Sequence, residues 1–282
     1  MLAVIGGTGI YSIDGLIVIE EHDIETPYGK PSAAIVSGEY YGKKILFLPR
    51  HGNNHSLLPS EVNYRANIWA LKKLGVKQII GLSAVGSLQQ EIKPGDLAIA
   101  DQYFDFVKLP REKTFFGQGV VAHVSTAEPT CSALADAISV AAKACNIDIH
   151  RNKTYACVDG PRLGTKAESL FLKNAANCDL VGMTNVPEVF LAREAQICYC
   201  TIGIATDYDC WHDDPSLHVT VEQVISRYGN SLVKAKTVLA AYIEGAEAQC
   251  SSGCNHALSS AVLTPTEAMN DQQKSLFNIL SL

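Results

Sequence analysis

The chain opens with Leu2-Ala-Val-Ile-Gly-Gly-Thr-Gly9, an apolar run followed by a glycine-rich loop. The apolar residues predict a buried strand at Leu2–Ile5. Glycines directly after a strand let the backbone approach an anion closely, and Thr8 adds a hydroxyl donor there. The stretch therefore indicates a strand that ends at a ligand, with a plain tight turn as the alternative.

Short apolar runs alternate with longer amphipathic ones through the rest of the chain, the pattern of an α/β domain. Further strands are expected at Ala33–Val36, Lys44–Leu48, Gln78–Leu82, Asp96–Ala100, Thr154–Val158, Asp179–Met183 and Ile197–Ala205. One helix should begin at a Ser60 cap and end at Gly75, and others should span Thr130–Cys145, Lys166–Ala176, Pro187–Glu194 and Val221–Ala246. No repeat or linker interrupts the series, so we expect one domain over residues 1–248.

Residues 249–282 form a C-terminal extension that begins polar and ends in a predicted helix. Thr264-Pro265-Thr266-Glu267 has the form of a capping box with proline at the first helical position. Apolar residues between Ala268 and Leu280 give this helix one apolar side. Such a helix either lies on the surface or covers a pocket.

The charge balance limits the class of partner. The formal net charge is −6 and the pI is near 5.7, which argues against broad binding to nucleic acid or anionic membranes. An anionic ligand would need a local pocket of donors. The first basic residue is Lys30 and no apolar run approaches the roughly 20 residues of a membrane span, so we expect a cytoplasmic protein. Only 18% of the residues are charged, which is compatible with an oligomer.

The chain has nine cysteines, most of them inside apolar runs where cysteine acts as a small hydrophobic residue. Cys198 and Cys200 lie two apart on an expected strand, a spacing that suits packing better than zinc. Cys250-Ser-Ser-Gly-Cys254 with His256 is the one cluster that suggests a metal or a disulfide. We expect reduced surface thiols there and no metal.

Several candidate ligand groups stand at the ends of expected strands, where α/β proteins place their ligands. Arg50 and His51 follow Lys44–Leu48 and offer a guanidinium fork and a second donor for phosphate. Ser83 stands in a small-residue turn, and Thr184 precedes the helix led by Pro187, whose free N–H groups favour an anion. For each of these segments a surface loop or tight turn is the alternative.

Thr206-Asp207-Tyr208-Asp209 is the sharpest feature of the sequence. The apolar strand Ile197–Ala205 delivers two carboxylates separated by one residue, and alternation puts both on one side if the extended geometry continues. Two carboxylates at one site favour a shared proton, as general acid chemistry requires. An exposed loop or a helix cap is the alternative.

A nicotinamide-dinucleotide-binding protein is the competing class that the opening loop suggests. From Gly7 the pattern G-x-G-x-x-G requires glycine at position 12, where the chain has Ser12. An acidic partner for the ribose is not singled out among Glu20, Glu21 and Asp23.

Taken in order, these segments resemble the methylthioadenosine phosphorylase family, within the trimeric purine-nucleoside phosphorylase fold. The likeness runs from Leu2 to Ala246 and rests on IGGTG (5–9), RHGNNH (50–55), VNYRANIWALK (62–72), SAVGSL (83–88), IKPGD (92–96), VDGPRLGTKAES (158–169), GMTNVPEVFLAREA (182–195) and ATDYDCW (205–211). Each motif is weak alone, but their common order is specific. The resemblance implies a single α/β domain with a twisted mixed β-sheet flanked by helices.

The resemblance also implies an activity and its residues. The enzyme would use inorganic phosphate, with no further cofactor, to convert 5′-methylthioadenosine to adenine and 5-methylthioribose 1-phosphate. Phosphate would be held by Thr8, Arg50, His51, Ser83 and Thr184. Asp207 and Asp209 would read and protonate the base, Ala84 and Leu163 would line it, and Met183 would lie against the ribose. Val221, Val224 and His123 of a neighbouring subunit would border the 5′ group, which implies a trimer or a hexamer.

Two positions depart from the family pattern. The family often has an aromatic residue where this chain has Leu163, and it can have asparagine where Gly182 stands. Both differences remove contacts to base or ribose but no catalytic group. Related 6-oxopurine enzymes have asparagine at the position of Asp207, so the Asp-Tyr-Asp triplet favours a 6-aminopurine. A 6-oxopurine nucleoside phosphorylase acting on methylthioinosine, inosine or guanosine is the nearest alternative.

Overall fold

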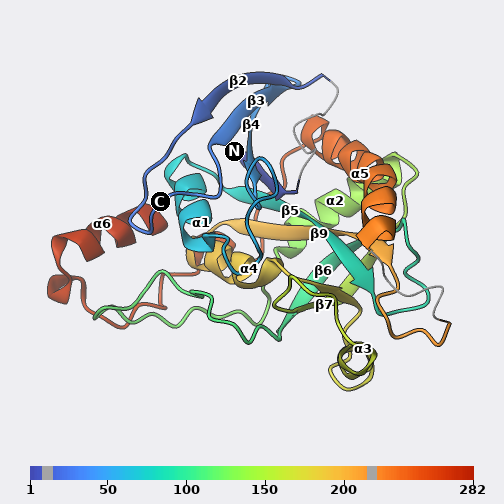
Figure 1. Cartoon of the computed structure of the whole chain (residues 1–282). Helices are drawn as coiled ribbons and strands as arrows, with labels where there is room; N and C mark the ends of the chain where they lie inside the picture. The colour runs from blue at the N-terminus through green and yellow to red at the C-terminus, as the bar shows by residue number, and fades with distance from the viewer. Residues whose placement is uncertain (8–14, 215–220) are drawn as a thin grey trace.

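The structure, a computed structural model of the 282-residue chain, describes residues 1–7, 15–214 and 221–282, with the backbone alone at 221–227 and 230 (Figure 1). The strands are β1 (Leu2–Gly6), β2 (Ile17–His22), β3 (Ile35–Tyr40), β4 (Lys43–Pro49), β5 (Gln78–Ser87), β6 (Leu97–Asp105), β7 (Ile149–Cys157), β8 (Leu180–Gly182) and β9 (Cys198–Asp207). The helices are α1 (Tyr64–Lys73), α2 (Ser132–Ala144), α3 (Lys166–Asn174), α4 (Asn185–Glu194), α5 (Val221–Glu244) and α6 (Asp271–Leu280). Of the helices described, none is long and apolar enough to cross a membrane.

The strands form one mixed sheet in the order β2-β3-β4-β1-β5-β8-β7-β6-β9. Its second half closes on itself, because β9 pairs with β5 as well as with β6. Strands β4, β1, β5 and β9 run parallel to one another, so their carboxyl ends share one edge of the sheet. The predicted ligand groups after β4 and at the end of β9 are thereby brought together. Ser83 was expected in a turn after Leu82, but it lies inside β5, which continues to Ser87.

Alternate residues of the central strands enter two hydrophobic cores on the two faces of the sheet. Ala3 and Ile5 of β1 join the core formed with α1 and α4, whereas Leu2 and Val4 join the core formed with α2 and α5. Figure 1 shows α2 and α5 on one side of the sheet and α1 and α4 on the other. Burial on both faces explains the continuous apolar runs that predicted these strands.

The expected α/β architecture with a mixed sheet and flanking helices is confirmed, and each expected strand overlaps an observed one. The edge strand β2 was not predicted, because its residues Ile17, Val18 and Ile19 are exposed and lack a two-residue alternation. The Ser60 cap was wrong. Residues 58–62 form a turn in which Glu61 and Val62 donate to the Leu58 carbonyl, and Asn63 caps α1 by accepting from the Ala66 N–H.

The predicted helix start at Thr264 was also wrong. The Thr264 hydroxyl accepts a hydrogen bond from the Val121 N–H at 2.9 Å, so it is engaged by another loop. Only a short 3₁₀ turn forms at Thr266–Ala268, and α6 begins later, behind a capping box made by Asn270 and Gln273. Leu258, Met269 and Leu280 of this tail are buried in the same core as α1 and α4.

Candidate active site

A cavity of about 1140 Å³ opens at the shared carboxyl ends of β1, β4, β5 and β9. Nine of the predicted site residues line it, namely Arg50, His51, Ser83, Ala84, Leu163, Met183, Thr184, Asp207 and Asp209. They come from five separate segments of the chain, which the fold brings to one place. This edge of the sheet is therefore the candidate active site.

Arg50 follows β4 and is almost fully buried beside the cavity. Its Nε and Nη2 donate to the Glu188 carboxylate at 2.6 and 2.8 Å, and Nη1 donates to the Leu82 carbonyl at 3.1 Å. Burial opposes the charge, but Glu188 raises the pKa of the guanidinium above its ordinary value. Arg50 therefore stays charged, and its hydrogen bonds to the described residues leave one N–H on each terminal nitrogen for an anion.

Two hydroxyl residues stand near this guanidinium at the cavity wall. Ser83 Oγ is buried and, within the described part of the chain, has no hydrogen-bond partner. Thr184 occupies the N-cap position of α4, and its side chain accepts no capping hydrogen bond. A buried donor without a partner beside a helix N-terminus favours a small anion such as phosphate.

The environment of His51 changes the role expected for its ring. Nδ1 lies 2.8 Å from the Leu57 carbonyl, which can only accept, so Nδ1 carries the proton. Burial lowers the pKa of His51 to about 4. In the neutral ring Nε2 is an acceptor, so the donor role expected of His51 toward phosphate stays a prediction. A hydroxyl of a protonated phosphate would suit that acceptor.

Asp207 and Asp209 lie next to each other at the end of β9, and both are buried. Asp207 Oδ2 accepts from the Thr206 hydroxyl at 2.6 Å and Oδ1 accepts from the Asp209 N–H at 2.8 Å. Extended geometry does not continue, since Asp209 has a φ of 52°. A left-handed turn, rather than strand alternation, brings the second carboxylate to the cavity. Gly86 leaves room for the pair, because a Cβ there would lie 3.1 Å from Asp207 Oδ1.

Met183 and Gly182 line the cavity between the group around Arg50 and the two aspartates. A Cβ at Gly182 would lie 2.0 Å from the Tyr155 hydroxyl, so the Tyr155 side chain occupies the space that an asparagine would need. This close approach gives a physical reason for the departure from the family pattern. Leu163 lines the cavity with 37% of its surface exposed.

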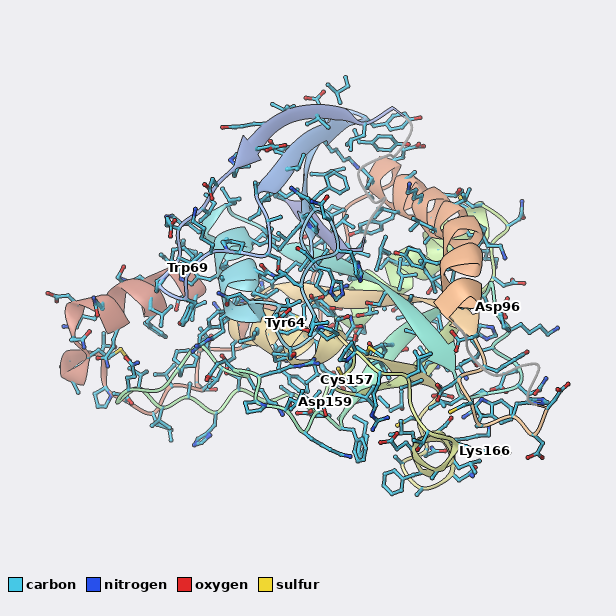
Figure 2. All side chains as sticks on the ribbon, viewed as in Figure 1. Tyr64, Trp69, Asp96, Cys157, Asp159 and Lys166 are labelled. Carbon is cyan, nitrogen blue, oxygen red and sulfur yellow. The ribbon has the colours of Figure 1, made fainter. Side chains whose placement is uncertain are left out.

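Arg111, which the sequence did not indicate, organises this wall. Its Nη1 donates to the carbonyls of Met183 and Val186, and its Nη2 donates to the carbonyl of Asp159, each at 2.8 Å. Figure 2 shows Tyr64, Cys157 and Asp159 grouped in the middle of the molecule, and Arg111 also contacts the Tyr64 hydroxyl. No local pattern in the loop around Arg111 marks it as buried.

Glu188 is a second residue whose role was missed, although a signal existed. It stands alone among apolar residues in Val186-Pro-Glu-Val-Phe-Leu191, and a buried acid requires a cation as partner. Tyr199 donates to Glu188 Oε1 at 2.7 Å, which further fixes the carboxylate. Tyr228 of α5, also not predicted, lines the cavity near Gly7.

Four predicted residues are not placed in the cavity. Thr8 lies outside the described residues, and for Val221 and Val224 the structure describes only the backbone at the start of α5. His123 is exposed in another loop, where its N–H donates to the Ala261 carbonyl at 2.8 Å. The expectation for His123 concerned a neighbouring subunit, so its role stays a prediction.

The fold and this cavity agree with the comparison to known families. Residues 1–244 match the model of the phosphorylase superfamily. The chain therefore belongs to the phosphorylase superfamily, and the dinucleotide-binding alternative is set aside.

Comparison with individual relatives points to a narrower group of enzymes within this superfamily. S-methyl-5′-thioadenosine phosphorylase of Geobacter sulfurreducens is 42% identical over 280 residues, 99% of this chain and 97% of the relative. The enzyme of the same name from Hyperthermus butylicus is 46% identical over 93% of this chain and 95% of the relative.

Solved structures give the same result. A methylthioadenosine phosphorylase from an antarctic soil metagenomic library has a TM-score of 0.91 and 42% identity over 99% of this chain and 98% of that chain. An S12T mutant of Schistosoma mansoni adenosine/methylthioadenosine phosphorylase, solved with methylthioadenosine, has a TM-score of 0.80 and 36% identity over 86% and 90% of the two chains.

Proposed function

We propose that this chain catalyses the phosphorolysis of 5′-methylthioadenosine to adenine and 5-methylthioribose 1-phosphate. The observation that carries the proposal is a single cavity with a guanidinium and an unpartnered serine hydroxyl at one part of its wall and a pair of buried aspartates at another. The choice of a 5′-thio-substituted adenosine as the substrate rests on the names of the relatives.

Phosphate is both nucleophile and electrostatic stabiliser in this reaction. The N9–C1′ bond breaks with its electron pair on the base, while a phosphate oxygen forms the new bond to C1′ through an oxocarbenium-like state. Hydrogenphosphate loses one proton overall and neutral adenine gains one. Arg50, Ser83 and Thr184 orient the phosphate below the sugar, and Thr8 and His51 complete its site.

The aspartates act on the leaving base. Asp207 delivers a proton toward N7 as the bond breaks, and a carboxylate oxygen of the pair accepts from the N6 amino group. The Thr206 hydroxyl and the Asp209 N–H hold Asp207 in place at the end of β9. Ala84 and Leu163 line the base, while Met183 packs against the ribose. No cofactor beyond phosphate takes part in this chemistry.

The assembly and location are part of the proposal. We expect a homotrimer, or a hexamer of two trimers, in which His123 of one subunit borders the 5′ group of the next and Val221 and Val224 complete that pocket. A cytoplasmic location fits the salvage of purine and methionine from this nucleoside.

The deciding experiment incubates the purified protein with methylthioadenosine, with and without phosphate, and follows free adenine. Adenine should appear only with phosphate, together with an equal amount of the sugar phosphate. Parallel reactions with adenosine, inosine and methylthioinosine measure base and 5′ selectivity. Adenine release without phosphate would indicate a hydrolase, and faster cleavage of the inosine nucleosides would favour the 6-oxopurine alternative.

A further inference from the structure

Four cysteine sulfurs, here called the thiol cluster, meet at the amino end of β9. Cys131 occupies the N-cap position of α2, Cys198 begins β9, and Cys250 and Cys254 belong to the C-terminal tail. Their Sγ atoms all lie within 4.8 Å of one another, and all except Cys250 are buried. In the part of the chain that the structure describes, all nine cysteines are free of disulfides.

The spacing of the sulfurs suits a tetrahedral metal ion. A Zn–S distance of about 2.3 Å puts the four sulfurs of a regular tetrahedron roughly 3.8 Å apart, within the observed limit. Cys250 and Cys254 are separated by three residues, and structural zinc sites often pair cysteines two to four residues apart. Gly253 has a φ of 65°, a left-handed turn that folds the chain back between the two thiols.

The groups around the thiol cluster suit a negatively charged centre. Arg193 Nη1 donates to Cys254 Sγ at 3.1 Å, and a disulfide sulfur would be a poor acceptor for that guanidinium. The amino end of α2 at Cys131 also favours negative charge. Ser252 Oγ lies 3.8 Å from Cys131 Sγ and is itself held 2.8 Å from Ser132 Oγ. Such outer contacts are typical of the groups that orient metal ligands.

We propose that Cys131, Cys198, Cys250 and Cys254 bind one Zn²⁺ ion in a closed structural site. Each thiol releases its proton to solvent on binding, so four thiolates and one divalent ion give a centre of charge −2, which Arg193 partly offsets. Four protein ligands leave no open position for water or substrate, which distinguishes this site from a catalytic one.

Because the proposed zinc site lies far from the cavity, we expect the ion to stabilise the fold rather than to take part in the reaction. Cys198 and Asp207 begin and end β9, roughly 30 Å apart along the strand, so the ion does not touch the reacting atoms. The ion would join α2, β9 and the tail. Beyond Cys254 the tail pairs with the loop that carries His123, through Leu263 donating to the Val121 carbonyl and His123 donating to the Ala261 carbonyl.

The first measurement uses the wild-type protein, purified under reducing conditions without a metal-affinity step. Elemental analysis should find about one zinc per chain. Replacement by Co²⁺ should produce thiolate-to-cobalt charge-transfer absorption and the intense visible bands of a tetrahedral site. The proposal is overturned if the reduced protein takes up neither Zn²⁺ nor Co²⁺ under anaerobic conditions, or if mass spectrometry of the native protein finds these cysteines in disulfides and no metal.

A matched pair of variants then assigns the ligands. Cys254→Ser should lose the zinc and lower the Tm by at least about 5 °C, while KM for phosphate stays unchanged at a temperature where the variant is folded. Cys145→Ser should keep both metal and Tm, because Cys145 lies outside the thiol cluster with its Sγ near the Thr237 carbonyl. Full zinc content in Cys254→Ser would count against the assignment. If that variant does not fold, the wild-type metal content still decides the proposal.

Discussion

Individual side chains in the cavity have part of their hydrogen-bonding capacity already engaged by the protein. Arg50 uses three of its N–H groups on Glu188 and Leu82, His51 uses Nδ1 on Leu57, and both oxygens of Asp207 accept from neighbours. These bonds hold the groups in place before a ligand arrives, which reduces the cost of ordering them during the reaction. A substitution at one of these residues is therefore most useful when it keeps the hydrogen bonds within the protein and changes only the group that faces the ligand.

Asp207→Asn tests the proposal that Asp207 is the acid that acts on the base. The amide keeps an oxygen for the Asp209 N–H and an amino group beside the Thr206 hydroxyl, so the fold should persist. It cannot transfer a proton, and kcat for methylthioadenosine should fall by about 10²–10⁴-fold with a smaller change in KM. The ratio of kcat/KM for adenine and hypoxanthine nucleosides should shift toward hypoxanthine. An unchanged ratio with both activities high would remove Asp207 from base recognition.

The buried imidazole of His51 should make stability depend on pH. Its pKa falls from 6.5 to about 4 on folding, so the unfolded chain binds more protons between these values. Stability is complete above about pH 6.5 and is lost as the pH falls toward 4, by at most about 3 kcal/mol from this residue. His51→Asn, whose amide can donate to the Leu57 carbonyl, should lose less stability over that window. Denaturant titrations of both proteins at pH 7.5 and pH 5 measure the difference, and parallel losses would contradict the assignment.

At the scale of secondary-structure elements, the ion pair Arg50–Glu188 joins the end of β4 to the first turn of α4. Both side chains are about 98–99% buried, so removing one leaves the other charge uncompensated. Breaking a buried pair in this way costs about 3–5 kcal/mol. The simple variant Arg50→Ala therefore mixes a loss of phosphate binding with a loss of stability.

Removing both charges separates the two effects. Arg50→Met combined with Glu188→Gln leaves no isolated charge, and the glutamine oxygen still accepts from Tyr199. This double variant should remain folded, whereas Arg50→Ala should unfold at lower denaturant. Its KM for phosphate should rise about 10- to 100-fold, the value of one charge-assisted contact, with KM for methylthioadenosine changed less. An unchanged KM for phosphate in the folded double variant would exclude Arg50 from the phosphate site.

At the scale of the whole molecule, His123 is exposed and does not line the cavity of its own chain, and the proposal places it at the site of a neighbouring subunit. Light scattering should give a mass of three chains or a multiple of three. His123→Ala should raise KM for methylthioadenosine and leave KM for phosphate unaffected. A fully active monomer would contradict the shared site.

Subunit mixing tests the sharing directly. Asp207→Asn chains and His123→Ala chains are each impaired, but a mixed oligomer contains sites with an intact Asp207 from one chain and an intact His123 from the next. Activity should therefore recover after the two variants are unfolded, mixed and refolded together. A mixture that only averages the two parent activities would place His123 and Asp207 in the same subunit's site, or His123 in none.

Local patterns in the sequence were sufficient for the buried strands, most of the helices and several polar residues that line the cavity, whereas Ala84, Leu163 and Met183 were assigned by resemblance to a family. Because the carboxyl ends of parallel strands share one edge, Arg50 after β4 and Asp207 at the end of β9 could be placed together once those strands were recognised. Ser83 lies inside β5 rather than after it, so its position needed the structure. Burial on both faces made those strands visible as apolar runs. Exposed elements such as β2 and irregular ones such as the turn at Thr266–Ala268 lack such a pattern.

Only the tertiary structure decided which distant groups became partners. The pairing of β5 with β9 closes the second half of the sheet on itself, and α4 places Glu188 beside Arg50. Packing of the C-terminal tail brings Cys250 and Cys254 to Cys131 and Cys198. These contacts join residues about 50 to 140 positions apart, and hydrophobic periodicity carries information about one element at a time. The chain's own residues determined what chemistry was available, and long-range packing determined where each group could act.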